Sequence, residues 1–199
     1  MFNKKELAPG IMVYSDVMEN HTQFVPAIEH FMNLNIPEIE WSNSYVYKDG
    51  KEMIDENRSS KTYFVEYNKT NSDILSQKYL LDLYARETIT KFCNSIELDY
   101  QKYYNVVVPD HKGYSILKYS EGSQFSDHID HNVFEPRTIS TVWYINDDYE
   151  GGEICFPRFN INYKPKANEM ILFPSTYTYN HSVLPIKNGI RYSVVSWLN

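Results

Sequence analysis

The chain has 199 residues, of which 42% are hydrophobic and 23% are charged, with only 7 Gly and 9 Pro. This composition is typical of one globular domain and excludes collagen-like and low-complexity chains. The net charge of −7 makes nucleic acid a poor expected partner, because proteins that bind the phosphate backbone usually carry positive charge.

The two cysteines, Cys93 and Cys155, are too few for a disulfide framework, and neither belongs to a Cys-x-x-Cys pair. The first residues lack the apolar run of a signal peptide, and no later stretch approaches the ~18 apolar residues of a membrane span. We therefore expect a soluble cytoplasmic protein that does not bind membranes. The sequence does not indicate its oligomeric state.

The N-terminal half begins with a short strand pattern at residues 11–17. Apolar residues at helical spacing then predict helices over residues 19–34 and 74–99. The later helix carries the clearer apolar stripe. Both helices are expected to pack on one face of a sheet.

Residues 35–72 are polar and irregular, with hydrophobic islands that are able to pair as strands. An insertion of this kind either closes over a site as a substrate lid or packs on its own barrel. The lid interpretation rests on its aromatic and basic side chains: Tyr45, Tyr47, Arg58, Tyr63 and Phe64.

From about residue 113 onward, short runs rich in β-branched and aromatic residues alternate with turn signals. The runs span residues 114–119, 124–130, 138–145, 153–156, 161–164, 169–173, 181–184 and 190–198. Eight short strands after a helical half predict an α+β, mainly β fold: a β-sandwich or jelly roll with the N-terminal helices packed on one sheet. We expect a single domain over 1–199, with 1–110 as support and 113–199 as core. The acidic stretch 147–150 is expected to be a solvated turn.

A His-x-Asp pattern at His128 and Asp130 is the first chemical signal. Alternate residues of a strand face the same side, so both side chains would project together while Ile129 points into the opposite layer. His181, at the start of a later strand, would complete a 2-His-1-carboxylate site with three positions open on Fe(II). Taken alone, the pattern also occurs by chance as a surface histidine beside a solvated aspartate, and His131 would point away.

Arg191 lies ten residues after His181 in an apolar segment. A guanidinium that faces a barrel interior requires an anion, and its planar geometry suits a carboxylate. The alternative is a surface arginine on an edge strand, which the apolar surroundings disfavour.

Residues 113–199 resemble the Fe(II)/2-oxoglutarate-dependent dioxygenases, and specifically the prolyl 4-hydroxylase group. The matching features are Tyr119, His128-x-Asp130, Arg137 with Ser140, Tyr144-Ile145-Asn146, Gly151-Gly152-Glu153, Phe156-Pro157, Pro165 before Met170-Ile171-Leu172-Phe173, His181, and Arg191 to Trp197. They cover nearly half of the chain in one order and at compatible spacings. The first 110 residues match only as helices packed behind a barrel.

The resemblance implies that His128, Asp130 and His181 are catalytic residues that ligate Fe(II). It also implies that 2-oxoglutarate is the cosubstrate, with its distal carboxylate on Arg191, and that O2 is the oxidant. Ascorbate is a further cofactor that the family commonly uses to rescue oxidised iron. The family's reaction releases succinate and CO2 and leaves a hydroxylated substrate.

The resemblance extends to the surroundings of the cosubstrate. Tyr119 and Tyr144 match tyrosines that hydrogen-bond its carboxylate, and Ser140 stands where the family usually has Thr. Trp197 matches a tryptophan of the pocket wall, although a plain core tryptophan is an equal alternative. Arg137 matches an arginine near the substrate, and a structural salt bridge is its alternative.

The expected substrate is a prolyl residue of a peptide or protein, hydroxylated at C4. Hydroxylation of a free amino acid or another small molecule is the competing reading, and a non-catalytic jelly-roll binding protein is a third. Asp130 argues against a halogenase, because the halogenases related to this family have a small residue in place of this carboxylate. Trp197 occupies the position of the second arginine of the alkylation-repair demethylases, which argues against a nucleic-acid substrate.

Overall fold

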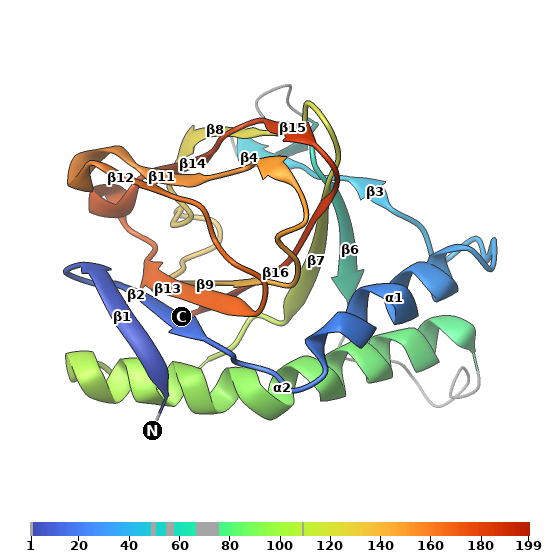
Figure 1. Cartoon of the computed structure of the whole chain (residues 1–199), viewed down its shortest axis with the longest axis horizontal. Helices are drawn as coiled ribbons and strands as arrows, with labels where there is room; N and C mark the ends of the chain where they lie inside the picture. Colours follow the sequence, from blue (N-terminus) through green and yellow to red (C-terminus); the bar gives the residue numbers. More distant parts are fainter. Residues whose placement is uncertain (1, 49–50, 55–57, 67–75, 109) are drawn as a thin grey trace.

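A computed structural model describes residues 2–48, 51–54, 58–66, 76–108 and 110–199. Two antiparallel sheets face each other, and two α-helices lie outside the larger sheet (Figure 1). This arrangement of sheets and helices is a jelly roll with helices on one side. None of the helices in the described ranges is long and apolar enough to cross a bilayer.

The larger sheet has eight strands in the order β1-β2-β13-β9-β16-β7-β6-β3, each antiparallel to its neighbours. In that order the strands are Asn3–Ala8, Ile11–Ser15, Glu169–Pro174, Ile139–Tyr144, Arg191–Leu198, Tyr114–Tyr119, Lys61–Val65 and Ser42–Asn43. The C-terminal half forms the centre of the sheet, and the N-terminal half extends it at both edges. The first half thus supplies strands as well as the expected helices.

The smaller sheet has four strands in the order β12-β11-β14-β8. These are Ile161–Tyr163, Ile154–Phe156, His181–Val183 and Phe125–His128. Two further pairs are β10 with β15 and β4 with β5. Their bounds are Glu150–Gly151, Ile186–Asn188, Val46–Lys48 and Lys51–Met53.

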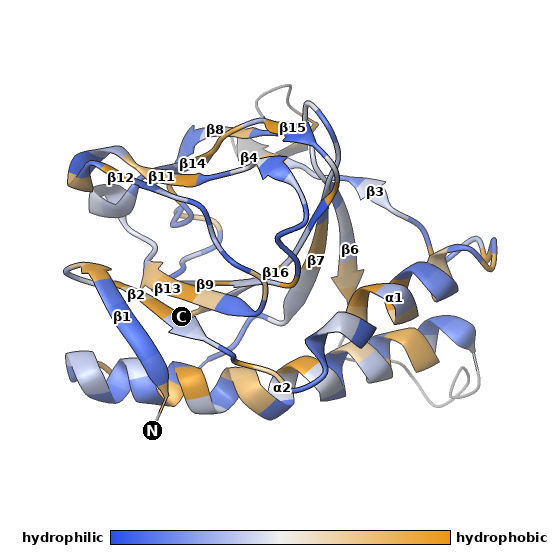
Figure 2. Ribbon diagram, in the orientation of Figure 1, coloured by the Kyte–Doolittle hydropathy of each residue, from blue (hydrophilic) through white to orange (hydrophobic). Residues whose placement is uncertain are grey.

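Helix α1 spans Phe24–Met32, after a short 3-10 turn at His21–Gln23, and α2 spans Gln77–Tyr104. Two more 3-10 turns occupy Pro157–Phe159 and Tyr177–Tyr179. The Ser76 hydroxyl caps α2 by accepting a hydrogen bond from the Tyr79 amide at 3.1 Å. Figure 2 shows hydrophobic and hydrophilic residues alternating along α2, as expected for a helix with one buried face.

Helix α2 continues five residues beyond the predicted end at residue 99, because its last turns are anchored to the β1–β2 turn. The buried Tyr100 hydroxyl donates to the Gly10 carbonyl at 2.8 Å, and the Tyr104 hydroxyl donates to Glu6 at 2.6 Å. Local sequence pattern does not reveal such long-range contacts.

The main core lies between the helices and the larger sheet. Trp143 on β9 meets Phe24 of α1 and Phe92 of α2, with ring centroids 5.2 and 4.9 Å apart. A second core lies between the sheets, where Phe156 and Phe173 pack edge to face at 5.0 Å. Both halves of the chain contribute to the main core.

All eight strands predicted after residue 113 are present, with small shifts at their ends. Strands β10 and β15 were missed because they overlap the turn signals Gly151-Gly152 and Lys187-Asn188-Gly189. Strand β1 was missed because its sequence, Asn-Lys-Lys-Glu-Leu-Ala, is mostly polar, as suits the edge of a sheet.

Candidate active site

His128, Asp130 and His181 converge at one end of the smaller sheet. His128 ends β8 and faces His181 at the start of β14, where the two residues are paired in register. The Asp130 carboxylate lies 3.6 Å from His128 Nε2 and 3.8 Å from His181 Nε2. One ligand atom from each residue lies within 4.8 Å of the other two. A metal ion sits roughly 2.1 Å from such donors, so the three atoms are close enough to share one ion.

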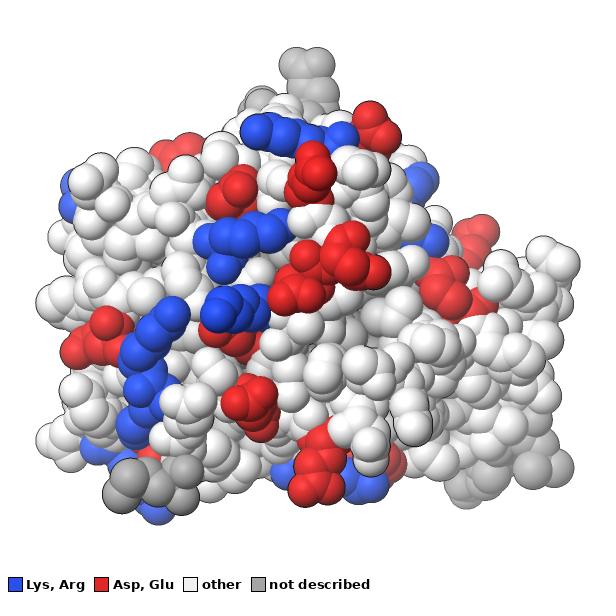
Figure 3. Space-filling model, in the orientation of Figure 1, with Lys and Arg blue, Asp and Glu red and all other residues white. Residues whose placement is uncertain are grey.

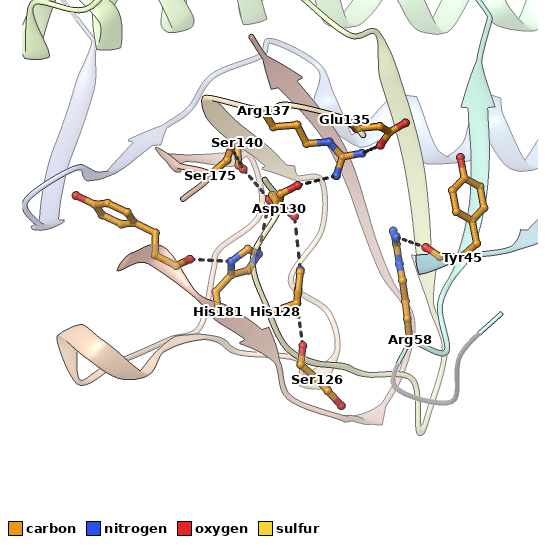
Figure 4. A network of polar contacts seen from close by, with 11 residues as sticks. Tyr45, Arg58, Ser126, His128, Asp130, Glu135, Arg137, Ser140, Ser175 and His181 are labelled. Atoms are coloured by element: carbon orange, nitrogen blue, oxygen red, sulfur yellow. Dashed lines mark hydrogen bonds and ion pairs between the residues drawn. The ribbon is translucent and has the colours of Figure 1, made fainter. Parts of the chain in front are cut away.

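Both histidines are oriented by backbone carbonyl groups (Figure 4). His128 Nδ1 lies 2.8 Å from the Ser126 carbonyl, and His181 Nδ1 lies 3.1 Å from the Tyr179 carbonyl. Since a carbonyl only accepts, each Nδ1 carries the proton, and each Nε2 lone pair is left for a ligand. The donor set is thus arranged as a 2-His-1-carboxylate metal site requires.

Electrostatics hold the cluster in the form that binds a cation. Burial raises the pKa of Asp130, but the neighbouring His181 and His128 and the Ser140 hydroxyl outweigh it and bring the pKa below its usual range. Burial and the His128 ring lower the pKa of His181 to about 4. At neutral pH Asp130 is therefore anionic and His181 neutral.

The prediction that His128 and Asp130 project from the same face of one strand was wrong. Strand β8 ends at His128, and Asp130 lies in a bend beyond it. Ile129 is 42% exposed and lines a cavity instead of entering the opposite layer. Asp130 is positioned by the Ser140 hydroxyl, which donates to its carboxylate at 2.6 Å, and by Arg137, whose Nη1 donates to its carbonyl at 3.3 Å.

Arg191 begins β16, is 2% exposed, and pairs in register with Tyr119 on β7. Its guanidinium lies 3.9 Å from the centre of the Tyr119 ring and 5.6 Å from that of Tyr144. Nη1 donates to the Gly152 carbonyl at 3.1 Å, but Nε is buried without a partner and no ion pair forms within the described ranges. A buried, unneutralised guanidinium is costly, so this end of the site requires an anion.

A cavity of about 450 Å³ joins the two ends. The histidine–aspartate cluster lines one part of it, and Arg191, Tyr119 and Tyr144 line another. Apolar walls separate them, formed by Leu117, Val142, Ile154, Val183 and Val195. A ligand with one end on a metal and a carboxylate at the other end matches this layout.

The remaining predicted site residues fall into two groups. Trp197 lines the cavity wall and supports Arg137, whose guanidinium lies 3.7 Å from its ring centre. Arg137 also lines the cavity, and it forms a salt bridge with Glu135 at 2.5 Å. Ser140 does not line the cavity; it lies behind Asp130, where it also bonds Ser175 at 2.7 Å.

The 35–72 segment places two of its expected lid residues at the cavity: Tyr45 and Arg58 line it. Tyr63 instead packs inward, and its hydroxyl donates to Asp82 of α2 at 2.7 Å. Phe64 is 42% exposed and stacks on Tyr45, and the side chain of Tyr47 lies outside the described residues.

Sequence reasoning missed Tyr149, which it placed in a solvated turn. Its ring is 6% exposed, packs against Gly152, and carries a buried hydroxyl without a partner in the described ranges. Burial raises the pKa of Tyr149 to about 12, although the Arg191 charge acts in the opposite direction. The acidic neighbours in the sequence concealed this buried position.

A second group of metal-capable residues, Cys93, Glu97 and His111, lies between α2 and the larger sheet. His111 Nδ1 accepts from the Gly113 amide at 3.0 Å, so Nε2 carries the proton and donates to Ser196 at 2.8 Å. Ser196 in turn donates to the Gly113 carbonyl at 2.7 Å. Since Nε2 already holds a proton in a closed network, we interpret this cluster as structural.

Residues 114–199 match the family model of the 2OG-Fe(II) oxygenase superfamily. The matched segment is less than half of the chain. The chain is similar to a PKHD-type hydroxylase of Prochlorococcus marinus, with 39% identity over 84 residues that cover 39% of this chain and 37% of the relative. It is 30% identical to human procollagen-lysine,2-oxoglutarate 5-dioxygenase 2 over 93 residues, 44% of this chain and 13% of the relative. The chain thus spans well under half the length of these relatives.

Solved structures share the fold over nearly the whole chain. A prolyl hydroxylase of Trichoplax adhaerens, in complex with a hypoxia inducible factor peptide, superposes with a TM-score of 0.68 and 16% identity. The match covers 95% of this chain and 83% of that one. A Pseudomonas putida prolyl-4-hydroxylase gives 0.63 at 17% identity, covering 96% and 92%. The N-terminal helices and strands thus belong to the shared fold.

Proposed function

We propose that the chain is an Fe(II)- and 2-oxoglutarate-dependent dioxygenase that hydroxylates a prolyl residue at C4. In this reaction a substrate C–H, O2 and 2-oxoglutarate become a substrate C–OH, succinate and CO2. The observation that carries the proposal is the cavity that joins a 2-His-1-carboxylate cluster to a buried arginine without a carboxylate partner in the described ranges.

The donor set fits the superfamily's metal. His128, Asp130 and His181 would hold Fe(II) through two imidazole nitrogens and one carboxylate, a set typical of non-haem iron oxygenases. Bound iron supplies the redox chemistry that couples O2 to decarboxylation of the cosubstrate and hydroxylation. Backbone carbonyls hold Nδ1 of each imidazole, so that Nε2 is turned toward the metal position, and Ser140 holds the carboxylate.

Arg191 fits the distal carboxylate of 2-oxoglutarate. Its buried Nε would gain an acceptor, and its charge would be neutralised inside the cavity. Tyr119 and Tyr144 hold the guanidinium by cation–π contact and line the space that the cosubstrate would occupy. A non-catalytic binding protein has no need for this cosubstrate site, so the enzyme is favoured.

A prolyl peptide is proposed as the substrate because solved prolyl hydroxylases share the fold and because Arg137, which the resemblance expects near the substrate, lines the cavity. Tyr45, on the 35–72 segment, adds an aromatic wall suited to a proline ring. The alternative substrate is a free amino acid or another small molecule, which a cavity of about 450 Å³ also accommodates.

Anaerobic reconstitution with Fe(II) and 2-oxoglutarate tests the cofactor assignment. Bidentate 2-oxoglutarate on ferrous iron gives a weak visible absorption band, which we expect here. Admission of O2 with a library of proline peptides should then yield succinate and a peptide heavier by one oxygen atom. Parallel reactions with and without ascorbate will show whether it sustains turnover.

The outcomes separate the alternatives. A band with succinate but no modified peptide would favour a free amino acid or another small molecule as the substrate. Absence of the band would contradict the assignment of iron and 2-oxoglutarate.

A further inference from the structure

Arg58 is a positively charged residue of the cavity wall that takes no part in the proposed binding of the metal or of 2-oxoglutarate. It comes from the 35–72 segment, forms an isolated bridge with Phe125 of β8, and lines the same cavity as the metal cluster. Its Nη1 donates to the Tyr45 carbonyl at 2.8 Å, while its Nε is buried without a partner among the described residues (Figure 4).

The cavity's three guanidinium groups differ in their charge balance. Arg137 is neutralised by Glu135, and Arg191 would receive the cosubstrate carboxylate. Arg58 has no carboxylate partner within the described ranges, although the chain as a whole carries a net charge of −7. A half-buried guanidinium with an unused donor is suited to an incoming carboxylate.

Arg58 is also close to the reacting centre. Its guanidinium lies 4.8 Å from the centre of the Phe125 ring, and that ring stacks on His128 at 3.5 Å with an interplanar angle of 17°. One aromatic ring therefore separates Arg58 from a metal ligand. A group bound by Arg58 would belong to the part of the substrate next to the carbon that reacts.

We propose that Arg58 binds a carboxylate of the substrate, so that the preferred substrate carries an acidic group beside the hydroxylated carbon. This inference rests on the proposed function and names the substrate class of the same cavity. The carboxylate belongs either to a free amino acid or to an acidic residue next to the target in a peptide. Both sources present the same chemistry to the guanidinium.

Matched acid and amide probes test the inference by binding. Calorimetry under argon, with Fe(II) and 2-oxoglutarate present, would compare L-proline with L-prolinamide, and an acetylated Ala-Pro-Glu amide with its Ala-Pro-Gln counterpart. We expect the acid to bind about tenfold or more tightly in at least one pair. A preference in the first pair identifies a free amino acid, and a preference in the second identifies an acidic peptide.

Arg58→Met should abolish that preference, because it keeps an unbranched side chain and removes the charge. Arg58→Lys should retain part of it, since Lys keeps the charge but loses the planar fork. Arg86→Met is the matched control, because Arg86 lies on α2, outside the larger sheet and away from the cavity. Circular dichroism would verify that each variant is folded, and the wild-type comparison requires no variant at all.

Equal affinities within both pairs, no binding of any probe, or a preference that survives Arg58→Met would each overturn the inference. The absorption band and the hydroxylated product are measured on the wild-type protein alone. A failure of the Arg58 inference is therefore distinguishable from a failure of the proposed function.

Discussion

At the scale of single residues, the site depends on groups that are buried before any ligand binds. Arg191 is 2% exposed and its Nε has no partner among the described residues, and Asp130 is held by a serine hydroxyl at 2.6 Å. Such groups are costly to bury, so their retention indicates that ligands complete them. Individual substitutions should consequently affect different ligands.

Replacement of Arg191 by Met should weaken 2-oxoglutarate binding by more than about tenfold, because a charge-assisted contact is lost. Iron binding should change much less, since Arg191 is not part of the metal cluster. Titration of the visible absorption band with 2-oxoglutarate measures the first effect, and anaerobic iron titration measures the second. If neither value moves, another residue binds the cosubstrate.

Replacement of Ser140 by Ala should weaken iron binding by about tenfold, because the hydroxyl fixes the Asp130 carboxylate. Ser140→Thr should restore most of the affinity, since it keeps the hydroxyl that Ala removes. Iron titration distinguishes this positioning role from a contact with the cosubstrate. A change in 2-oxoglutarate affinity at constant iron affinity would place Ser140 in the cosubstrate site instead.

At the scale of secondary structure elements, the site depends on the pairing of β8 with β14 and on the support of the larger sheet by α2. The in-register pair His128–His181 brings two proposed metal ligands together from positions 53 residues apart. The larger sheet holds Arg191 and Tyr119 in register on neighbouring strands. Helix α2 covers the other side of that sheet, so its anchoring contributes to the stability of the whole site.

The Tyr100 hydroxyl ties the end of α2 to the β1–β2 turn. Tyr100→Phe should lower the free energy of unfolding by about 1 kcal/mol, because the buried Gly10 carbonyl loses its donor. Tyr103→Phe is the matched control, since Tyr103 is 54% exposed on the same helix. Urea denaturation measures both variants, and an equal effect of the two would contradict this role for the Tyr100 hydroxyl.

At the scale of the whole molecule, charge is distributed differently inside and outside. Figure 3 shows acidic and basic side chains next to one another on one face of the surface. The described lining of the cavity instead contains three arginines and a single carboxylate, that of Asp130. This arrangement favours anionic ligands within a protein whose net charge is −7.

Metal and cosubstrate should stabilise the whole fold, because they bind the folded state and not the unfolded chain. Fe(II) with 2-oxoglutarate at about 100 times the dissociation constant should add about 2.7 kcal/mol to the free energy of unfolding. Anaerobic thermal denaturation measures this gain, and a chelator should remove it.

Asp130→Ala should lose both the ligand-induced stabilisation and hydroxylation while keeping the fold. Asp110→Ala, at an exposed position away from the cavity, is its matched control. Retention of turnover in Asp130→Ala would remove Asp130 from the ligand set.

The sequence by itself determined which chemistry we propose for the site, because that proposal follows from the types of side chain present. His128, Asp130, His181 and Arg191 stand at the spacings that resemble an iron oxygenase, and apolar runs located eight of the ten strands described after residue 113. Strand patterns and the His128-x-Asp130 spacing can be recognised in the sequence because each depends on residues close together in the chain.

Only the tertiary structure decided where these groups lie and which of their charges are neutralised. It showed that Asp130 reaches the metal position from a bend, that Tyr149 is buried beside Gly152, and that Arg58 lines the cavity. It also showed that Glu135 neutralises Arg137 while Arg58 and Arg191 keep unpartnered donors within the described ranges. Burial depends on segments far apart in the chain, and no local pattern encodes it.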